Sequence, residues 1–116
     1  MTSQPIVVDL AGELDLATIE RLDARLAEVP DSADLVIDLR LTTFLDSVTL
    51  ALLVQTSRRL SRGGGRLVLA EARGSSVRRV LSITQIDRAL PYADTVAAAL
   101  ALLADPPSSG SPSAPD

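Results

Sequence analysis

The chain of 116 residues contains neither cysteine nor histidine. Their absence excludes disulfide bonds, thiol nucleophiles, histidine general bases and the common zinc sites, and it leaves carboxylates and hydroxyls as the candidate reactive groups. Aromatic residues make up only 2% of the sequence. Aliphatic residues must therefore fill the core, and aromatic platforms that stack on bases or sugars are excluded. We expect no metal and no cofactor.

Long apolar runs are also missing, and no segment of the sequence approaches the length of a membrane span. The first residues, Met-Thr-Ser-Gln-Pro, lack the basic and then hydrophobic pattern of a signal peptide. We therefore expect a cytoplasmic protein that does not insert into a membrane.

The formal net charge of -4 is unevenly distributed along the chain. Residues 1–57 contain three arginines and ten acidic residues, whereas residues 58–116 contain eight arginines and five acidic residues. Surfaces of opposite sign suit a charge-complementary protein partner better than nucleic acid, whose phosphates the acidic half would repel. The alternative is that most of these charges lie on ordinary solvated faces.

Strand-like and helix-like apolar spacings alternate along the chain. They predict strand 5–10, helix 16–29, strand 35–39, helix 46–62, strand 66–70, a short helix beginning near 74–76, an extended segment within 86–92, and helix 94–104. Such alternation is typical of a largely parallel sheet with helices packed against it. Residues 105–116, DPPSSGSPSAPD, cannot bury enough apolar area to offset their ordering entropy. We therefore expect one domain over residues 1–104 and a disordered tail over 105–116.

Two details of this pattern concern the core. We expect the inward stripe of the first helix to begin at Leu16. After strand 35–39, we expect Thr42 and Thr43 to form a short polar crossing before Phe44 and Leu45 return to the core.

The helix predicted over 46–62 opens at Asp46 and Ser47. The first amide groups of a helix lack partners within it, and a side-chain oxygen from either residue can accept from them. A hydroxyl at this position lies at the positive end of the helix dipole, which favours a phosphate. Considered alone, Ser47 is most simply interpreted as a helix-capping serine.

Four stretches together resemble the STAS domain of anti-sigma factor antagonists, also called anti-anti-sigma factors. They are GELDLAT at 12–18, LVIDLRLTTFLDS at 35–47, RLVLA at 66–70 after a glycine-rich break, and SITQIDRALPYADTVAAAL at 82–100. They follow the order and spacing of the family over nearly all of residues 6–103. The resemblance implies an α/β protein of the STAS fold, with about four mostly parallel strands packed against about four helices, from a bacterium and without enzyme activity.

The resemblance also implies a function in transcription regulation by partner switching. Antagonists of this family bind an anti-sigma factor that is also a serine kinase, and so release a sigma factor. Phosphorylation of a serine at the start of the second helix blocks binding, and a serine phosphatase restores it. Carried onto this chain, the phosphoacceptor is Ser47, and the implied partner-binding residues are Asp15, Asp46, Ser47, Val48, Thr49 and Leu50. We expect a monomer or a weak dimer.

The chain departs from the family pattern at one position in this motif. Family members usually have a glycine where this chain has Thr49, and the branched side chain of threonine could hinder a kinase. Thr49 could be a second phosphoacceptor, but a helix cap or a hydroxyl bonded back to the chain is the simpler interpretation.

Two other functions compete with the regulatory one. STAS domains also dock on the ATPase of lipid-transport ABC systems, and the LALLV sequence at 50–54 would suit such a role. An enzyme could use Asp15, Asp38 and Asp46 in acid–base work, but a domain of this size offers little room for the pocket that such work requires. Asp38 is better interpreted as a turn-stabilising acceptor than as a metal ligand.

Overall fold

Strands and helices alternate along the chain, as the sequence pattern predicts. The computed structural model describes residues 4–72, 74–83 and 90–104. Its elements are β1 (Ile6–Leu14), α1 (Ile19–Ala27), β2 (Leu35–Leu45), α2 (Ser47–Arg62), β3 (Leu67–Ala70), α3 (Ser76–Ile83), β4 (Tyr92–Ala93) and α4 (Val96–Ala104). The tail predicted over 105–116 and residues 86–89 of the predicted extended segment lie outside the described residues.

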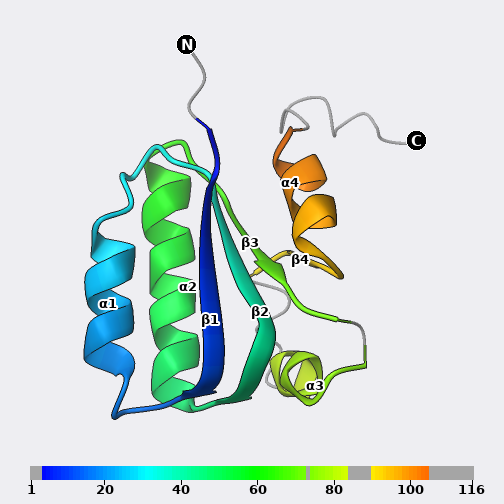
Figure 1. Cartoon of the computed structure of the whole chain (residues 1–116). Coiled ribbons are helices and arrows are strands. Elements are labelled where there is room, and N and C mark those ends of the chain that lie inside the picture. The colour runs from blue at the N-terminus through cyan, green and yellow to red at the C-terminus, as the bar shows by residue number, and fades with distance from the viewer. Residues whose placement is uncertain (1–3, 73, 84–89, 105–116) are drawn as a thin grey trace.

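The strands of the described chain form one sheet of four strands in the order β1-β2-β3-β4. Every neighbouring pair is parallel, which confirms the predicted α/β class. Because parallel strands all point the same way, their carboxyl ends gather at one end of the sheet, the lower end in Figure 1. We call this the carboxyl end of the sheet and the other the amino end. β1 begins and α4 finishes at the amino end (Figure 1).

Helices cover the two faces of the sheet unequally. α1 and α2 lie side by side on one face (Figure 1), where Leu22, Leu26, Leu53 and Leu60 pack in the larger core cluster. α4 covers β2 and β3 on the other face, where Ala99 and Leu103 pack against Val36, Val68 and Ala70. β1 extends beyond this cover, and Val7 is 41% exposed.

α3 lies at the carboxyl end of the sheet and is seen nearly end-on in Figure 1. Its Val77 and Leu81 are buried in the larger core cluster. Arg78 ties this helix to the rest of the fold, because its Nη1 donates to the Glu71 carbonyl oxygen at 3.0 Å and to Asp94 Oδ1 at 3.2 Å. The same guanidinium lies 3.4 Å from the centre of the Tyr92 ring.

β2 is longer than its apolar run predicts, and the predicted polar crossing was wrong. Thr42 and Thr43 lie within the strand, which continues to Leu45. Two register shifts relative to β1, between Asp9 and Ala11 and between Gly12 and Glu13, place extra residues on the β2 side. Such bulges change which face a side chain points to. Leu45 is buried as expected, but Phe44 is 49% exposed, so its predicted place in the core was wrong.

The first helix begins later than predicted. Residues 15–18 form a turn and α1 starts at Ile19, because the carbonyl oxygen of Asp15 accepts from the Thr18 amide at 3.0 Å and closes the chain into that turn. Leu16 is consequently 69% exposed, and its predicted inward position was wrong. β1 also runs through Gly12 to Leu14, with Gly12 at a φ of 78° inside the strand, so the predicted strand end at residue 10 was wrong.

The glycine-rich break after α2 lies where the sequence predicts it. Gly63 is the C-cap of α2, and Gly64 has the left-handed φ of 96° that commonly ends a helix. Gly65 is needed for a different reason, because a Cβ at this position would collide with the carbonyl oxygen of Ala33. The backbone of Gly65 therefore packs directly against the backbone of Ala33 at the amino end of the sheet.

Candidate functional site

The first turn of α2 holds the residue that the sequence singles out, Ser47. Asp46 is the N-cap of this helix, and its Oδ1 accepts the Thr49 amide at 2.8 Å. Ser47 is the first helical residue and is exposed. Of the two capping residues that the sequence allows, the structure therefore uses Asp46, and capping does not occupy the Ser47 hydroxyl.

Thr49 anchors the same turn from inside the protein. Its side chain is 0% exposed, and its Oγ1 donates to the carbonyl oxygen of Leu14 at 3.2 Å. The amide of Asp46 donates to the same Leu14 oxygen at 3.1 Å. The Thr49 hydroxyl is thus bonded back to the chain, as the simpler interpretation of the sequence has it, and its side chain does not stand between Ser47 and solvent.

Asp15 reaches the site through the pairing of the two long strands. Leu14 pairs with Leu45 at the carboxyl end of β1 and β2, and Asp15 and Asp46 are the next residues on each strand. The side chain of Asp15 stabilises the turn before α1, where its Oδ1 accepts the Ala17 amide at 3.0 Å. Two carboxylates therefore follow paired strand ends, next to Ser47.

The predicted partner-binding residues divide into a surface group and a supporting group. Ser47 is exposed, Val48 is 45% exposed, and Asp15 and Asp46 are half-buried. Thr49 and Leu50 are buried, at 0% and 4% exposure, so they support the turn from beneath and present no side chain to a visiting protein.

The electrostatics of this turn are acidic. The pKa of Asp46 lies below its ordinary value, chiefly because its carboxylate accepts the backbone N–H of Thr49. Asp46 is therefore charged at neutral pH, at the helix end whose free amide groups favour negative charge. Exposed Leu16 and Val48 add apolar surface at the same end of the molecule.

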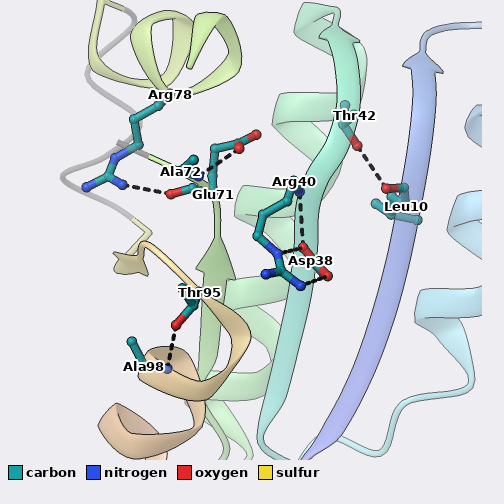
Figure 2. Close-up of polar contacts among 9 residues, drawn as sticks. All are labelled: Leu10, Asp38, Arg40, Thr42, Glu71, Ala72, Arg78, Thr95 and Ala98. Atoms are coloured by element: carbon teal, nitrogen blue, oxygen red, sulfur yellow. Dashed lines mark hydrogen bonds and ion pairs between the residues drawn. The ribbon is translucent and has the colours of Figure 1, made fainter. Parts of the chain in front are cut away.

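A second set of polar residues lies further up the sheet, on β2 and β3. Figure 2 shows Arg40 folded onto Asp38, with Nε to Oδ1 at 2.9 Å and Nη2 to Oδ2 at 3.0 Å. This pairing is the main reason that the pKa of Asp38 is lowered. Asp38 lies inside β2, so its predicted role in stabilising a turn at a strand end was wrong. Its Oδ1 accepts the Arg40 amide at 3.0 Å within the strand instead.

Glu71, directly after β3, is a polar residue that the sequence reasoning missed. It is 2% exposed, and its Oε1 accepts the Ala72 amide at 2.8 Å. Its Oε2 is buried without a hydrogen-bond partner. Burial is the main cause that raises the pKa of Glu71 above its ordinary value. The available signal was an acidic residue immediately after the apolar run LVLA.

The three aspartates of the competing enzyme hypothesis do not form one site. Asp38 pairs in register with Asp9, several residues before the strand ends that Asp15 and Asp46 follow. Over residues 4–72, 74–83 and 90–104, no group of three or more acidic, His or Cys side chains could hold a metal ion. Within the same ranges, no helix has the length and apolar character needed to cross a bilayer.

Comparison with known proteins identifies the fold and its family. A sequence model of the STAS domain matches residues 2–99. The chain belongs to the STAS domain family. A solved anti-sigma factor antagonist from Mycobacterium paratuberculosis is 34% identical to this STAS domain, with a TM-score of 0.75 and 85% of each chain covered.

More distant structures share the STAS fold. An anti-sigma factor antagonist (STAS) domain protein from Planctomyces limnophilus is 25% identical, with a TM-score of 0.67 and 79% of this chain and 80% of that chain covered. The STAS domain of a SulP transporter from Vibrio cholerae is 17% identical, with a TM-score of 0.65 and 88% of this chain and 82% of that chain covered, and it shows the fold alone. A search of curated proteins finds no significant match. The family and fold implied by the sequence motifs are confirmed.

Proposed function

We propose that this STAS domain protein is an anti-sigma factor antagonist. In this role it binds an anti-sigma factor in the cytoplasm, and the sigma factor that the anti-sigma factor held is released. The 34% identity to a solved antagonist over 85% of each chain supports this class of partner. The partner is also a serine kinase that acts on Ser47, and a serine phosphatase reverses the modification.

One observation carries the proposal. Ser47 is exposed at the first position of α2, while Asp46 caps the helix and Thr49 fixes the turn to Leu14. The hydroxyl is thereby presented on a rigid turn without being needed to hold that turn. A residue with this placement can be modified with little effect on the fold.

The chemical step is phosphoryl transfer from ATP. The Ser47 oxygen attacks the γ-phosphorus, the bond between that phosphorus and the β,γ-bridging oxygen breaks, ADP leaves, and the hydroxyl proton passes to a base of the kinase. The catalytic groups belong to the kinase, and the STAS domain supplies only the acceptor and needs no cofactor. The phosphatase transfers the phosphoryl group to water and restores the hydroxyl.

Phosphorylation acts on binding through charge. It adds about -1.5 to -2 charges beside Asp15 and Asp46, which already make the site acidic. The amide groups at the start of α2 offset part of the repulsion within the protein. A partner surface that fits a neutral hydroxyl meets an unmatched dianion, which weakens binding by about 2 to 5 kcal/mol.

The direct contacts come from the surface group, Asp15, Asp46, Ser47 and Val48. Thr49 and Leu50 contribute indirectly, since they hold the turn in place from within the core. This division predicts that substitutions in the first group change affinity, whereas substitutions in the second change stability.

The site assignment is tested by mapping the phosphate. The purified chain is incubated with a candidate anti-sigma factor kinase and ATP, and the modified residue is identified by mass spectrometry. Ser76 is the matched control, because it is also an exposed first helical residue, in a helix capped by its neighbour Ser75. We expect phosphate on Ser47 and none after Ser47→Ala. Phosphate on Ser76 or elsewhere, with Ser47 unmodified, would remove the assignment.

The switch itself is tested by binding. Ser47→Asp should weaken binding to the anti-sigma factor and leave the melting temperature nearly unchanged, whereas Ser76→Asp should affect neither. A large loss of stability in Ser47→Asp would instead show that this serine has a structural role.

The competing role in a lipid-transport ABC system loses its sequence support. In the LALLV run, Leu50 and Leu53 are buried, and Leu52 and Val54 pack against the same core. These leucine and valine side chains therefore stabilise the domain itself, and of the run only Ala51 is exposed. Binding to a purified ATPase of that class, with none to an anti-sigma factor, would reverse the preference.

A further inference from the structure

A small notch separates the end of β2 from α3. Its volume is about 120 Å³, and it is lined by Thr43, Phe44, Leu45, Ser76, Val77 and Val80. Leu45 and Val77 are buried, whereas Phe44 is 49% exposed and Val80 is 36% exposed. The notch therefore has an apolar lining, part of which faces solvent.

The exposure of Phe44 follows from the backbone of β2. The two register shifts against β1 turn the last residues of the strand away from the regular alternation. Phe44 is the single phenylalanine in a sequence with 2% aromatic residues. About half of its side chain lies in water, where it adds little to the core, and it shares the rim of the notch with a second exposed apolar residue, Val80.

The notch is close to Ser47. Phe44 precedes Ser47 by three residues, so a fully extended backbone would separate them by at most about 10 Å. A standard protein interface buries about 800 Å² on each partner, which corresponds to a disc roughly 30 Å across. An interface of this size centred on Ser47 extends about 15 Å from it in each direction and thus reaches as far as Phe44.

Exposed apolar side chains lie on both sides of Ser47. Leu16 is 69% exposed in the turn before α1, and Val48 is 45% exposed in α2. Phe44 lies across the notch from Val80 of α3, the helix that Figure 1 shows at the carboxyl end of the sheet. This arrangement gives an acidic centre with apolar contacts around it, and apolar side chains next to a polar centre are typical of binding surfaces.

We propose that the notch is a second contact for the anti-sigma factor, which inserts an apolar side chain between Phe44 and Val80. The proposal rests on the proposed function, because it assigns the notch to the same partner that meets Ser47. The two contacts have different tasks. The apolar contact supplies affinity that does not depend on phosphorylation, whereas Ser47 decides whether the acidic centre can be covered.

The test measures the affinity of the unphosphorylated chain for the anti-sigma factor kinase that modifies Ser47. We expect Phe44→Ser and Val80→Ser each to weaken binding about tenfold or more, as loss of an anchor residue does. Val7→Ser and Leu102→Ser are matched controls, because these residues are 41% and 43% exposed and lie away from Ser47, near the start of β1 and the end of α4. The controls should change affinity by less than about twofold, and melting temperatures verify that each variant is folded.

The outcomes separate this proposal from the proposed function. Normal binding by Phe44→Ser and Val80→Ser, with binding lost in Ser47→Asp, would overturn the notch contact and leave the function standing. Weakening by the notch variants with none by Ser47→Asp would keep the contact and remove the switch. Equal weakening by Val7→Ser and Leu102→Ser would overturn the notch as a specific site. Loss of a dimer in Phe44→Ser, with unchanged affinity for the kinase, would assign the notch to a second copy of this chain and overturn the proposal.

Discussion

The junctions between β2 and α2 and between β3 and α3 use the same kind of bond with opposite electrostatic results. After β2, Asp46 accepts the Thr49 amide at 2.8 Å, and after β3, Glu71 accepts the Ala72 amide at 2.8 Å. The pKa of Asp46 is lowered, chiefly by its backbone hydrogen bond, whereas the pKa of Glu71 is raised, chiefly by burial. Access to water, rather than the hydrogen bond, decides the direction of the shift.

The difference also separates a turn that is open to solvent from one whose carboxylate is buried. At the first junction the carboxylate remains charged beside an exposed serine, so a partner or a phosphoryl group can alter its surroundings. At the second, Glu71 is 2% exposed and has an oxygen without a partner. A charge there destabilises the fold and is out of reach of another protein.

The largest effect is expected at the buried anchor of the first junction. Thr49→Ala removes a fully buried methyl group and the hydroxyl that donates to Leu14, and should lower the free energy of unfolding by about 2 kcal/mol. Thr43→Ala is the control, because Thr43 is an exposed threonine near the end of β2, the strand that precedes α2. Urea unfolding measures both variants, and equal losses would show that the Thr49 bond contributes nothing particular.

The second junction should respond in the opposite direction. Glu71→Gln removes a buried charge, keeps an acceptor for Ala72, and should raise the free energy of unfolding at pH 7 by about 1 kcal/mol. Because the folded pKa is raised above the ordinary value of a glutamate carboxyl, the folded wild-type protein binds more protons than the unfolded chain. Its stability is therefore highest below that value and falls as pH rises through the folded pKa. Denaturant titrations across this range should show that slope in the wild type and its loss in Glu71→Gln.

A smaller loss of stability is expected when the N-cap of α3 is removed. At this second junction a serine, rather than a carboxylate, caps the helix. Ser75 Oγ accepts the Arg78 amide at 3.0 Å, and Ser75→Ala should cost roughly 0.8 kcal/mol in the free energy of unfolding. Ser76→Ala changes the exposed neighbour and should cost less. If the two variants unfold at the same denaturant concentration, Ser75 is not the effective cap of α3.

The smallest effect is expected from Asp46→Asn, because asparagine caps a helix about as well as aspartate. The folded pKa of Asp46 is lowered from the ordinary value of an aspartate carboxyl, so its contribution is present above that value and is lost as pH falls through the folded pKa. Any advantage of the wild type over Asp46→Asn in melting temperature should therefore disappear in strong acid. An advantage that persists there would assign the effect to packing rather than charge.

The sequence predicted the elements of this fold better than their limits. Local signals were enough to predict the start of α2, because two of them agreed. Capping residues, Asp46 and Ser47, stand where the apolar spacing changes from that of a strand to that of a helix. The end of β2 was missed because Thr42 and Thr43 were interpreted as a polar break, although threonine is a good strand residue. The apolar run alone also gives no sign of a bulge. Phe44 was assigned to the core for the same reason, since only the register against β1 shows which way it points.

The sequence predicted where Ser47 lies in the fold but not the details of the turn around it. The sequence placed a hydroxyl at the start of α2, but it left open whether Asp46 or Ser47 caps the helix and where Thr49 points. Both answers depend on Leu14, a residue far away in sequence. Its carbonyl oxygen accepts hydrogen bonds from the Asp46 amide and the Thr49 hydroxyl. Glu71 was missed because burial of a carboxylate depends on the tertiary packing around the connection between β3 and α3, and no local pattern encodes that packing.

The first residues of β1 and the last turn of α4 both lie at the amino end of the sheet, while Ser47 lies at the opposite end (Figure 1). An attachment at the first residues of β1 or in the last turn of α4 would thus lie away from the serine. The domain can consequently be immobilised through a side chain in either of these segments for the binding measurements, without masking the region under study.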